Sequence, residues 1–117
     1  MGHVYARVKM TSPVTGESLT VDSLVDTGAT FTAIPASLGE RLKLPHVTRR
    51  RVRTAGGEEE LPESYALVEV LGERTTTPVL LSERLDRVLM GALTLEALAL
   101  KVDPKTGKLE RTEVLLL

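Results

Sequence analysis

Short extended segments separated by turn residues run through most of this 117-residue chain. Apolar and polar side chains alternate over residues 4–10, with the period of two expected of a half-buried strand, and residues 12–16 have turn chemistry. Apolar segments bounded by Gly or Pro predict further strands at residues 19–25, 31–34, 47–54, 58–70, 78–81, 88–90, 99–102 and 109–117. Only two short helices are expected, over residues 35–42 and 92–98. The chain is therefore predicted to be all-β with one or two short helices.

The length of the chain indicates a single domain over residues 1–117. A chain of this size buries about 65 to 70% of its extended surface, which suffices for one core but not for two lobes with a cleft between them. Any such cleft would need a second chain. There is no cysteine, and His3 and His46 lack metal-ligand spacing, so a transition-metal site is not expected.

No membrane or targeting segment is evident in the sequence. No apolar run reaches the roughly 18 residues of a membrane-spanning helix, and the first residues lack a basic segment followed by an apolar one. The formal net charge is −1, and the basic residues 49–53 would face the acidic residues 58–60 across a hairpin. We therefore expect a cytoplasmic protein with no membrane or nucleic-acid partner.

The triplet Asp26-Thr27-Gly28 is the strongest candidate for chemistry. It follows the apolar pair Leu24-Val25, so a loop leaving a buried strand would display its carboxylate. Asp26 would be the acid or base, and the Thr27 hydroxyl could tie the loop down. Gly28 has no Cβ, so its N–H could approach the carboxylate. A solvated turn is the alternative interpretation of the triplet by itself.

Hydrolysis by carboxylates requires two of them, one ionised to take a proton from water and one protonated to polarise the carbonyl. The chain offers one suitable aspartate, because Asp22, Asp86 and Asp103 all lack the Asp-Thr-Gly environment. A twofold axis that places Asp26 against its copy would supply the second carboxylate. The chemistry thus predicts a homodimer.

Two predicted strands meet at Ala55-Gly56-Gly57. A pair of glycines supplies the positive φ angles that tight hairpin turns need. With the turn at Gly56-Gly57, Val52 would face Leu61 and Arg53 would face Glu60. The segment is either a simple tight turn or, if Asp26 is catalytic, a mobile cover over the site.

Residues 24–30 and the later Val88-Leu89-Met90-Gly91-Ala92 resemble the retroviral-type (retropepsin-like) aspartic proteases, especially their small bacterial single-domain members. The hairpin at residues 55–57 occupies the place of the family's flap. The resemblance implies a closed, mostly antiparallel β-barrel, a homodimer, and hydrolysis of peptide bonds without metal or cofactor. It implies a catalytic role for Asp26, a supporting loop of Thr27, Gly28 and Ala29, a flap of Ala55, Gly56 and Gly57, and a second apolar-Gly motif of Leu89, Met90 and Gly91.

The chain departs from the family pattern at one charge pair. Retroviral members usually carry an acidic residue at the place of Thr30 and an Arg in the helix after the second glycine, where this chain has residues 92–96, Ala-Leu-Thr-Leu-Glu. A non-catalytic peptide-binding or dimerisation module that keeps the protease fold is therefore the alternative function. The three leucines at 115–117 are expected to form a buried terminal strand or a dimer edge.

Overall fold

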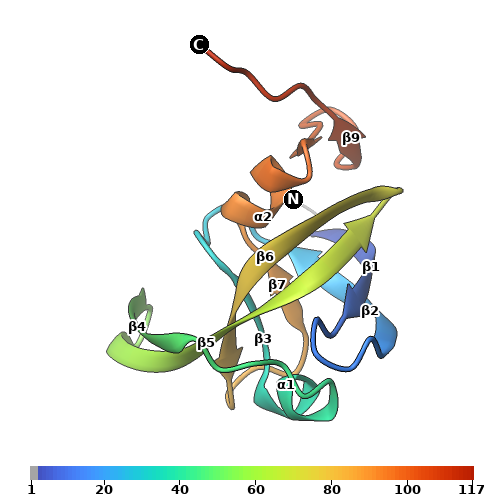
Figure 1. Cartoon of the computed structure of the whole chain (residues 1–117). Helices are drawn as coiled ribbons and strands as arrows, with labels where there is room; N and C mark the ends of the chain where they lie inside the picture. The colour runs from blue at the N-terminus through green and yellow to red at the C-terminus, as the bar shows by residue number, and fades with distance from the viewer. Residues whose placement is uncertain (1–2) are drawn as a thin grey trace.

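The computed structural model describes residues 3–117, which form nine strands and two short helices (Figure 1). The strands are β1 (Val4–Thr11), β2 (Ser18–Val25), β3 (Thr32–Pro35), β4 (Thr48–Thr54), β5 (Gly57–Val70), β6 (Glu73–Ser82), β7 (Val88–Met90), β8 (Leu100–Val102) and β9 (Leu109–Arg111). The helices are α1 (Ala36–Arg41) and α2 (Ala92–Ala97). Within residues 3–117, neither helix is long and apolar enough to cross a membrane.

The principal sheet closes on itself as a barrel. Its strand order is β1-β2-β7-β3-β6-β5-β4, and β1 also pairs with β5, so six strands form the barrel and β4 flanks β5. The pairs β2–β7 and β3–β6 are parallel, whereas the remaining pairs are antiparallel. The predicted closed, mostly antiparallel barrel is confirmed. Closure removes most of the free sheet edge that an open sheet would expose.

The core fills the barrel with the inward-facing half of each strand. Because successive side chains of a strand point to opposite faces, alternate residues of β1, β5 and β7 are buried while their neighbours are exposed or half-buried. Each fully buried aliphatic side chain contributes about 1.5 to 3 kcal/mol relative to an exposed one. The buried cluster consists of Val8, Met10, Ile34, Leu42, Ala66, Val68, Val70, Val79, Val88, Met90, Leu95, Leu98 and Leu100.

The turn of the β4–β5 hairpin lies one residue earlier than predicted, which shifts the pairing partner of each β4 residue by two positions. Thr54 pairs with Gly57, so Ala55 and Gly56 form the turn, and Arg53 faces Glu58 rather than Glu60. The Thr54 hydroxyl accepts the N–H of Gly56 at 3.2 Å and donates to the carbonyl of Gly57 at 3.1 Å. This side chain closes the turn at Ala55-Gly56, a contact that the glycine pair alone does not reveal.

Two boundaries also differ from the predictions. β6 begins at Glu73 rather than residue 78, because Leu71 and Gly72 both have positive φ (53° and 83°) and form a tight turn after β5. Helix α1 begins after Pro35, which ends β3 with φ −58° and ψ 136°. The proline therefore lies immediately before the helix instead of within its first turn.

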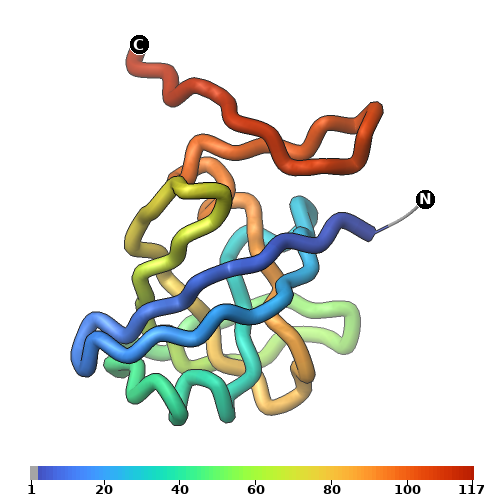
Figure 2. The backbone as a smooth tube through the Cα atoms, turned by 90° about the vertical axis from the view of Figure 1, so that its right-hand side faces the viewer, coloured from blue at the N-terminus to red at the C-terminus, as the bar shows by residue number. Residues whose placement is uncertain are grey.

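The C-terminal segment is not the long strand that was predicted. Only Leu109–Arg111 pair, antiparallel with β8, and residues 112–117 then extend away from the barrel (Figures 1 and 2). The prediction of a buried terminal strand is wrong for the isolated chain, because the side chains of Leu115, Leu116 and Leu117 are exposed. Their apolar surface has no partner within residues 3–117.

Candidate active site

Asp26 lies on a loop that leaves the carboxyl end of β2. Its side chain is half-buried, and its N–H donates to the carbonyl of Met90 at 2.9 Å. The Gly28 N–H donates to Asp26 Oδ1 at 3.1 Å, and the Ala29 N–H donates to the Asp26 carbonyl at 3.1 Å. A Cβ on Gly28 would lie 3.3 Å from Asp26 Oδ1, closer than most real Cβ contacts. The loop thus turns tightly around its own carboxylate.

Thr27 differs from the expectation that its hydroxyl would tie the loop down. The residue is exposed, and its hydroxyl forms no hydrogen bond with residues 3–117. The exposed Thr27 and Gly28 form the outermost part of the loop. This part of the loop is open to a neighbouring molecule.

The second apolar-Gly motif holds the Asp26 loop from inside. β7 lies between β2 and β3, parallel to the first and antiparallel to the second. Beyond β7, the Ala92 N–H donates to the Ala29 carbonyl at 2.8 Å, and the Leu93 N–H donates to the Thr30 carbonyl at 2.9 Å. With the Met90 contact, residues 90–93 therefore hold the loop by three main-chain hydrogen bonds.

Three buried threonines extend this support, and the sequence interpretation did not include them. Thr32 Oγ1 accepts the Gly91 N–H at 3.1 Å and lies 2.6 Å from Thr94 Oγ1, which lies 2.7 Å from Thr77 Oγ1. Each is at most 2% exposed. Their signal in the sequence is weak, because a threonine at an inward position of a strand or helix cannot be distinguished from a residue that only packs in the core.

A row of apolar side chains lies beside the Asp26 loop. Leu24 of β2 is in register with Leu89 of β7, which is in register with Ala33 of β3. Their chain neighbours Ser23, Thr32, Ile34, Val88 and Met90 are buried, so these three half-buried side chains project from the opposite face of the sheet. The row offers an apolar surface next to the carboxylate.

The stem of the β4–β5 hairpin contacts the residue that follows the loop. The Arg50 guanidinium lies 5.2 Å from the ring centre of Phe31, and its Nε donates to Glu63 Oε1 at 2.7 Å. The Glu63 residue is only 8% exposed. Arg50 therefore joins both hairpin strands to the segment that enters β3.

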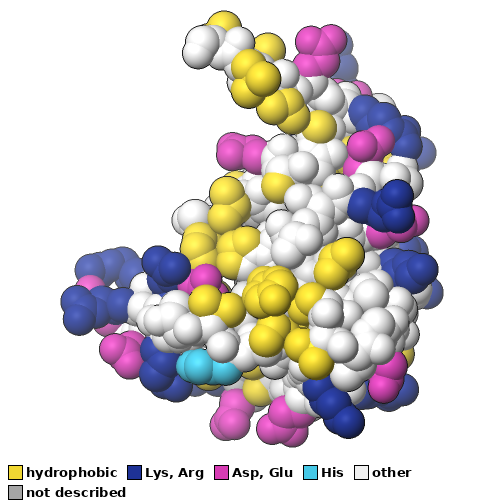
Figure 3. Space-filling view, viewed as in Figure 1, with side chains coloured by type: hydrophobic (Ala, Val, Ile, Leu, Met, Phe, Trp, Pro, Cys, Tyr) yellow, Lys and Arg dark blue, Asp and Glu magenta, His cyan; other side chains and the backbone are white. Residues whose placement is uncertain are grey.

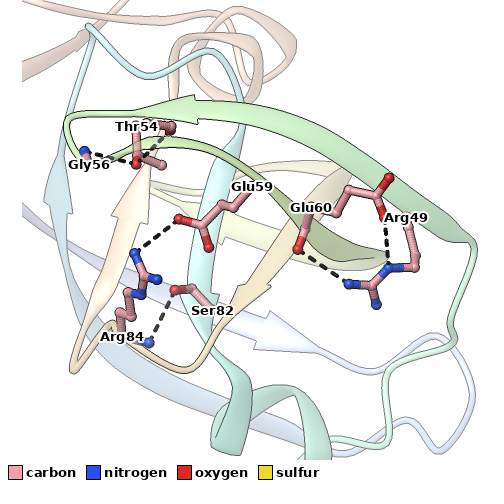
Figure 4. A network of polar contacts seen from close by, with 8 residues as sticks. Arg49, Thr54, Gly56, Glu59, Glu60, Ser82 and Arg84 are labelled. Carbon is pink, nitrogen blue, oxygen red and sulfur yellow. Dashed lines mark hydrogen bonds and ion pairs between the residues drawn. The ribbon is translucent and has the colours of Figure 1, made fainter.

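The returning hairpin strand also contacts the loop before β7 (Figure 4). Arg84 Nη1 lies 3.3 Å from Glu59 Oε2, and the Arg84 N–H donates to the Ser82 hydroxyl. Figure 4 shows this ion pair apart from the Arg49–Glu60 pair, which lies along the hairpin. The hairpin tip at residues 55–57 is exposed. The hairpin is thus held by contacts along its stem and exposed at its tip.

Charges of both signs are interspersed on the hairpin, as Figure 3 shows on one side of the molecule. Arg53 pairs with Glu58 at 2.8 Å, in addition to the pairs formed by Arg49 and Arg50. This alternation supports the expectation that the basic segment does not create a strong positive field. Among residues 3–117 there is no group of three or more metal-ligating side chains.

One hollow in the described chain lies away from Asp26, which is not among its lining residues. It has a volume of about 970 Å³ and lies between β2, α1 and the loop before β7. Leu38, Arg41, Leu85 and Val88 are among its lining residues. Asp26 itself is half-buried, and the neighbouring Thr27 and Gly28 are exposed.

The closed barrel, its Asp-Thr-Gly loop and the glycine that supports it define a protein of the aspartic protease class. The aspartyl protease family model matches residues 12–92, more than half of the chain, and the chain belongs to this family. Among solved structures, the fold is similar to EIAV protease complexed with the inhibitor HBY-793. The TM-score is 0.69 at 18% identity, covering 87% of this chain and 93% of that chain. No curated protein sequence matches.

Proposed function

We propose that this chain is an aspartic endopeptidase of the retroviral type that acts as a homodimer. The observation that carries the proposal is the Asp26 loop, in which the carboxylate receives the Gly28 N–H and the backbone is held by residues 90–93. A carboxylate fixed on a supported loop is suited to acid–base chemistry, because it is already positioned and the loop does not have to be ordered in each turnover.

A second copy would complete the site. Each chain contributes one Asp-Thr-Gly loop, with Thr27 and Gly28 exposed at its outer edge. A twofold axis beside these residues brings the two Asp26 carboxylates together and encloses the apolar rows between the two copies. This arrangement agrees with the exposure of Thr27 and Gly28 in the single chain.

In the proposed reaction the two carboxylates share one proton. The ionised Asp26 takes a proton from a water molecule, whose oxygen attacks the peptide carbonyl carbon, while the protonated Asp26 of the other copy donates to the carbonyl oxygen. The tetrahedral gem-diol then collapses: its C–N bond breaks, the leaving nitrogen takes the proton that the first carboxylate took from water, and one gem-diol hydroxyl returns its proton to the other carboxylate as the carbonyl re-forms. One proton remains on the pair, so the enzyme is regenerated.

We propose an extended peptide with apolar side chains near the scissile bond as the substrate. Leu24, Leu89 and Ala33 would contact these side chains, and the hairpin at residues 55–57 would cover them. Desolvation of the bond beneath a cover strengthens the polar interactions that act on it.

Cleavage of a mixed peptide pool by the parent and by Asp26→Asn tests the proposal. The amide keeps the shape of Asp26 but cannot accept a proton, so cleavage should fall by at least about a thousandfold. Asp22→Asn is the matched control, because Asp22 is exposed and pairs with Arg7 on the outer strands. Parent protein that binds peptides without cleaving them would instead support the non-catalytic module.

The homodimer is tested by sedimentation at tens of micromolar protein. We expect a dimer with an interface of at least about 1,200 Å². A species that is strictly monomeric under these conditions and still cleaves peptides would contradict the shared site.

A further inference from the structure

We infer that the buried Thr32, Thr94 and Thr77 hydroxyls form one directed hydrogen-bond chain that positions the Asp26 loop for catalysis, with Thr94 as the central positioning residue. The inference rests on the proposed proteolytic function for its catalytic consequence. The structural coupling between the threonines and the loop can be tested without activity.

The direction of the hydrogen-bond chain follows from counting the protons that each group can donate. The Gly91 N–H can only donate, so Thr32 Oγ1 accepts it. At the other end, Thr77 Oγ1 donates to the Pro78 carbonyl at 3.4 Å. Thr77 therefore accepts from Thr94, since each hydroxyl has only one proton.

The same count fixes the middle of the chain. Thr94 has donated its proton to Thr77, so it must accept from Thr32 across their 2.6 Å contact. Each group then donates its hydrogen bond in the same direction, from the Gly91 N–H through the three hydroxyls to the Pro78 carbonyl. No buried side-chain polar atom among residues 3–117 lacks a partner, and such complete networks are the ones that rigidify a core.

The hydrogen-bond chain connects three elements to residues 90–93, which hold the Asp26 loop. Thr32 is on β3, Thr94 on α2 and Thr77 on β6. Gly91, which the chain anchors, lies between Met90 and Ala92, whose carbonyl and N–H bind Asp26 and Ala29. The hydrogen bonds thereby link the position of the Asp26 carboxylate to buried side chains inside the barrel.

The three hydroxyls carry no charge, and each is at most 2% exposed. Loss of the Thr94 hydroxyl leaves the Thr32 proton without its acceptor in a site without water-facing surface. Thr32 must then reorient, and its bond to the Gly91 N–H weakens. The Asp26 loop loses the support that fixes Gly91, and small displacements of a reacting group can lower rates by up to about a hundredfold.

The experiment compares Thr94→Val, which keeps the shape but removes the hydroxyl, with Thr94→Ser, which keeps the hydroxyl but removes the methyl group. We expect Thr94→Val to lower kcat by about tenfold or more with KM within about twofold. Thr94→Ser should restore kcat to within about threefold of the parent. A simple packing role predicts the opposite order, with serine worse than valine.

Ser12→Ala is the matched control. Ser12 is 1% exposed, and its hydroxyl accepts the Val14 and Thr15 N–H groups in the turn between β1 and β2. This variant should lose stability without a loss of kcat per folded molecule. If Thr94→Val does not fold, Thr77→Val carries the same test at the end of the chain, with an expected loss of about threefold.

Amide hydrogen exchange separates this inference from the proposed function. In Thr94→Val the Gly91 and Asp26 amides should exchange at least about tenfold faster than in the parent, while the Val68 amide in the core changes less. Thr94→Ser should restore them. If the parent shows no Asp26-dependent cleavage, the proposed function fails, and the exchange rates alone decide whether the coupling exists. Equal exchange in parent and Thr94→Val, or unchanged kcat in a folded Thr94→Val protease, would overturn the inference.

Discussion

Gly91 lies so close to Phe31 that a Cβ atom on the glycine would fall 2.5 Å from both the carbonyl carbon and the carbonyl oxygen of Phe31. The same Cβ would lie 3.0 Å from the Ala29 carbonyl oxygen. These neighbours are backbone atoms, which cannot rotate aside as the end of a side chain can. The glycine therefore permits the close contact between the Asp26 loop and the start of α2.

We predict that Gly91→Ala destabilises the protein by about 3 kcal/mol, because the methyl group must separate two backbone segments in a packed region. Urea unfolding measures the change. Gly56→Ala is the control: its nearest neighbour would be Thr54 Oγ1 at 3.8 Å, an ordinary contact, so it should be neutral or stabilising by up to about 1 kcal/mol. Similar losses in both variants would show that space around Gly91 is not the cause.

A second prediction concerns Gly28 and catalysis. Its Cβ would lie 3.3 Å from Asp26 Oδ1, so Gly28→Ala should shift the carboxylate by a few tenths of an ångström without blocking the fold. We expect kcat/KM to fall by at least about tenfold while the unfolding midpoint changes little. Turnover equal to that of the parent would mean that this loop is not the active-site loop.

The third prediction separates two ion pairs of the same hairpin. Glu63 is nearly buried and pairs with Arg50, whereas Glu58 and Arg53 are both exposed. Arg50→Met should lower the free energy of unfolding by about 1 to 2 kcal/mol, because it leaves a poorly solvated carboxylate unpaired. Arg53→Met should lower it by less than about 0.5 kcal/mol. Denaturant titrations of the two variants give the comparison, and equal effects would reject a special role for Glu63.

A fourth prediction is that the hairpin is a mobile lid whose movement is restrained by Arg84. Residues 55–57 are exposed, and Arg84 contacts Glu59 in the returning strand. Amide exchange should be fast at the tip, should slow when a peptide-like inhibitor binds, and should speed up along β4 and β5 in Arg84→Met. Arg7→Met, which removes an ion pair on β1 and β2, is the control. Equal protection with and without inhibitor would contradict the lid.

Local sequence patterns were sufficient for most of the strands, the Asp26 loop and the family, because each depends on residues close together in the chain. Alternation marks a half-buried strand such as β1, and the Asp-Thr-Gly triplet contains both the carboxylate and the glycine whose N–H reaches it. The failures were local as well. The hydrogen bonds of the Thr54 hydroxyl accompany a turn one residue earlier than predicted, and Leu71 has a positive φ that no pattern in the sequence indicated.

Only the tertiary structure decided what surrounds the loop. Thr32 and Thr94 are 62 positions apart in the chain, and Arg50 of β4 contacts Phe31, which precedes β3. Such pairs have no local periodicity, since a hydroxyl or guanidinium finds its partner through packing of distant strands. The sequence determined a carboxylate on a tight loop. The closed barrel determined that its support is a chain of uncharged hydroxyls, because it brings β3, β6 and α2 together at one buried point.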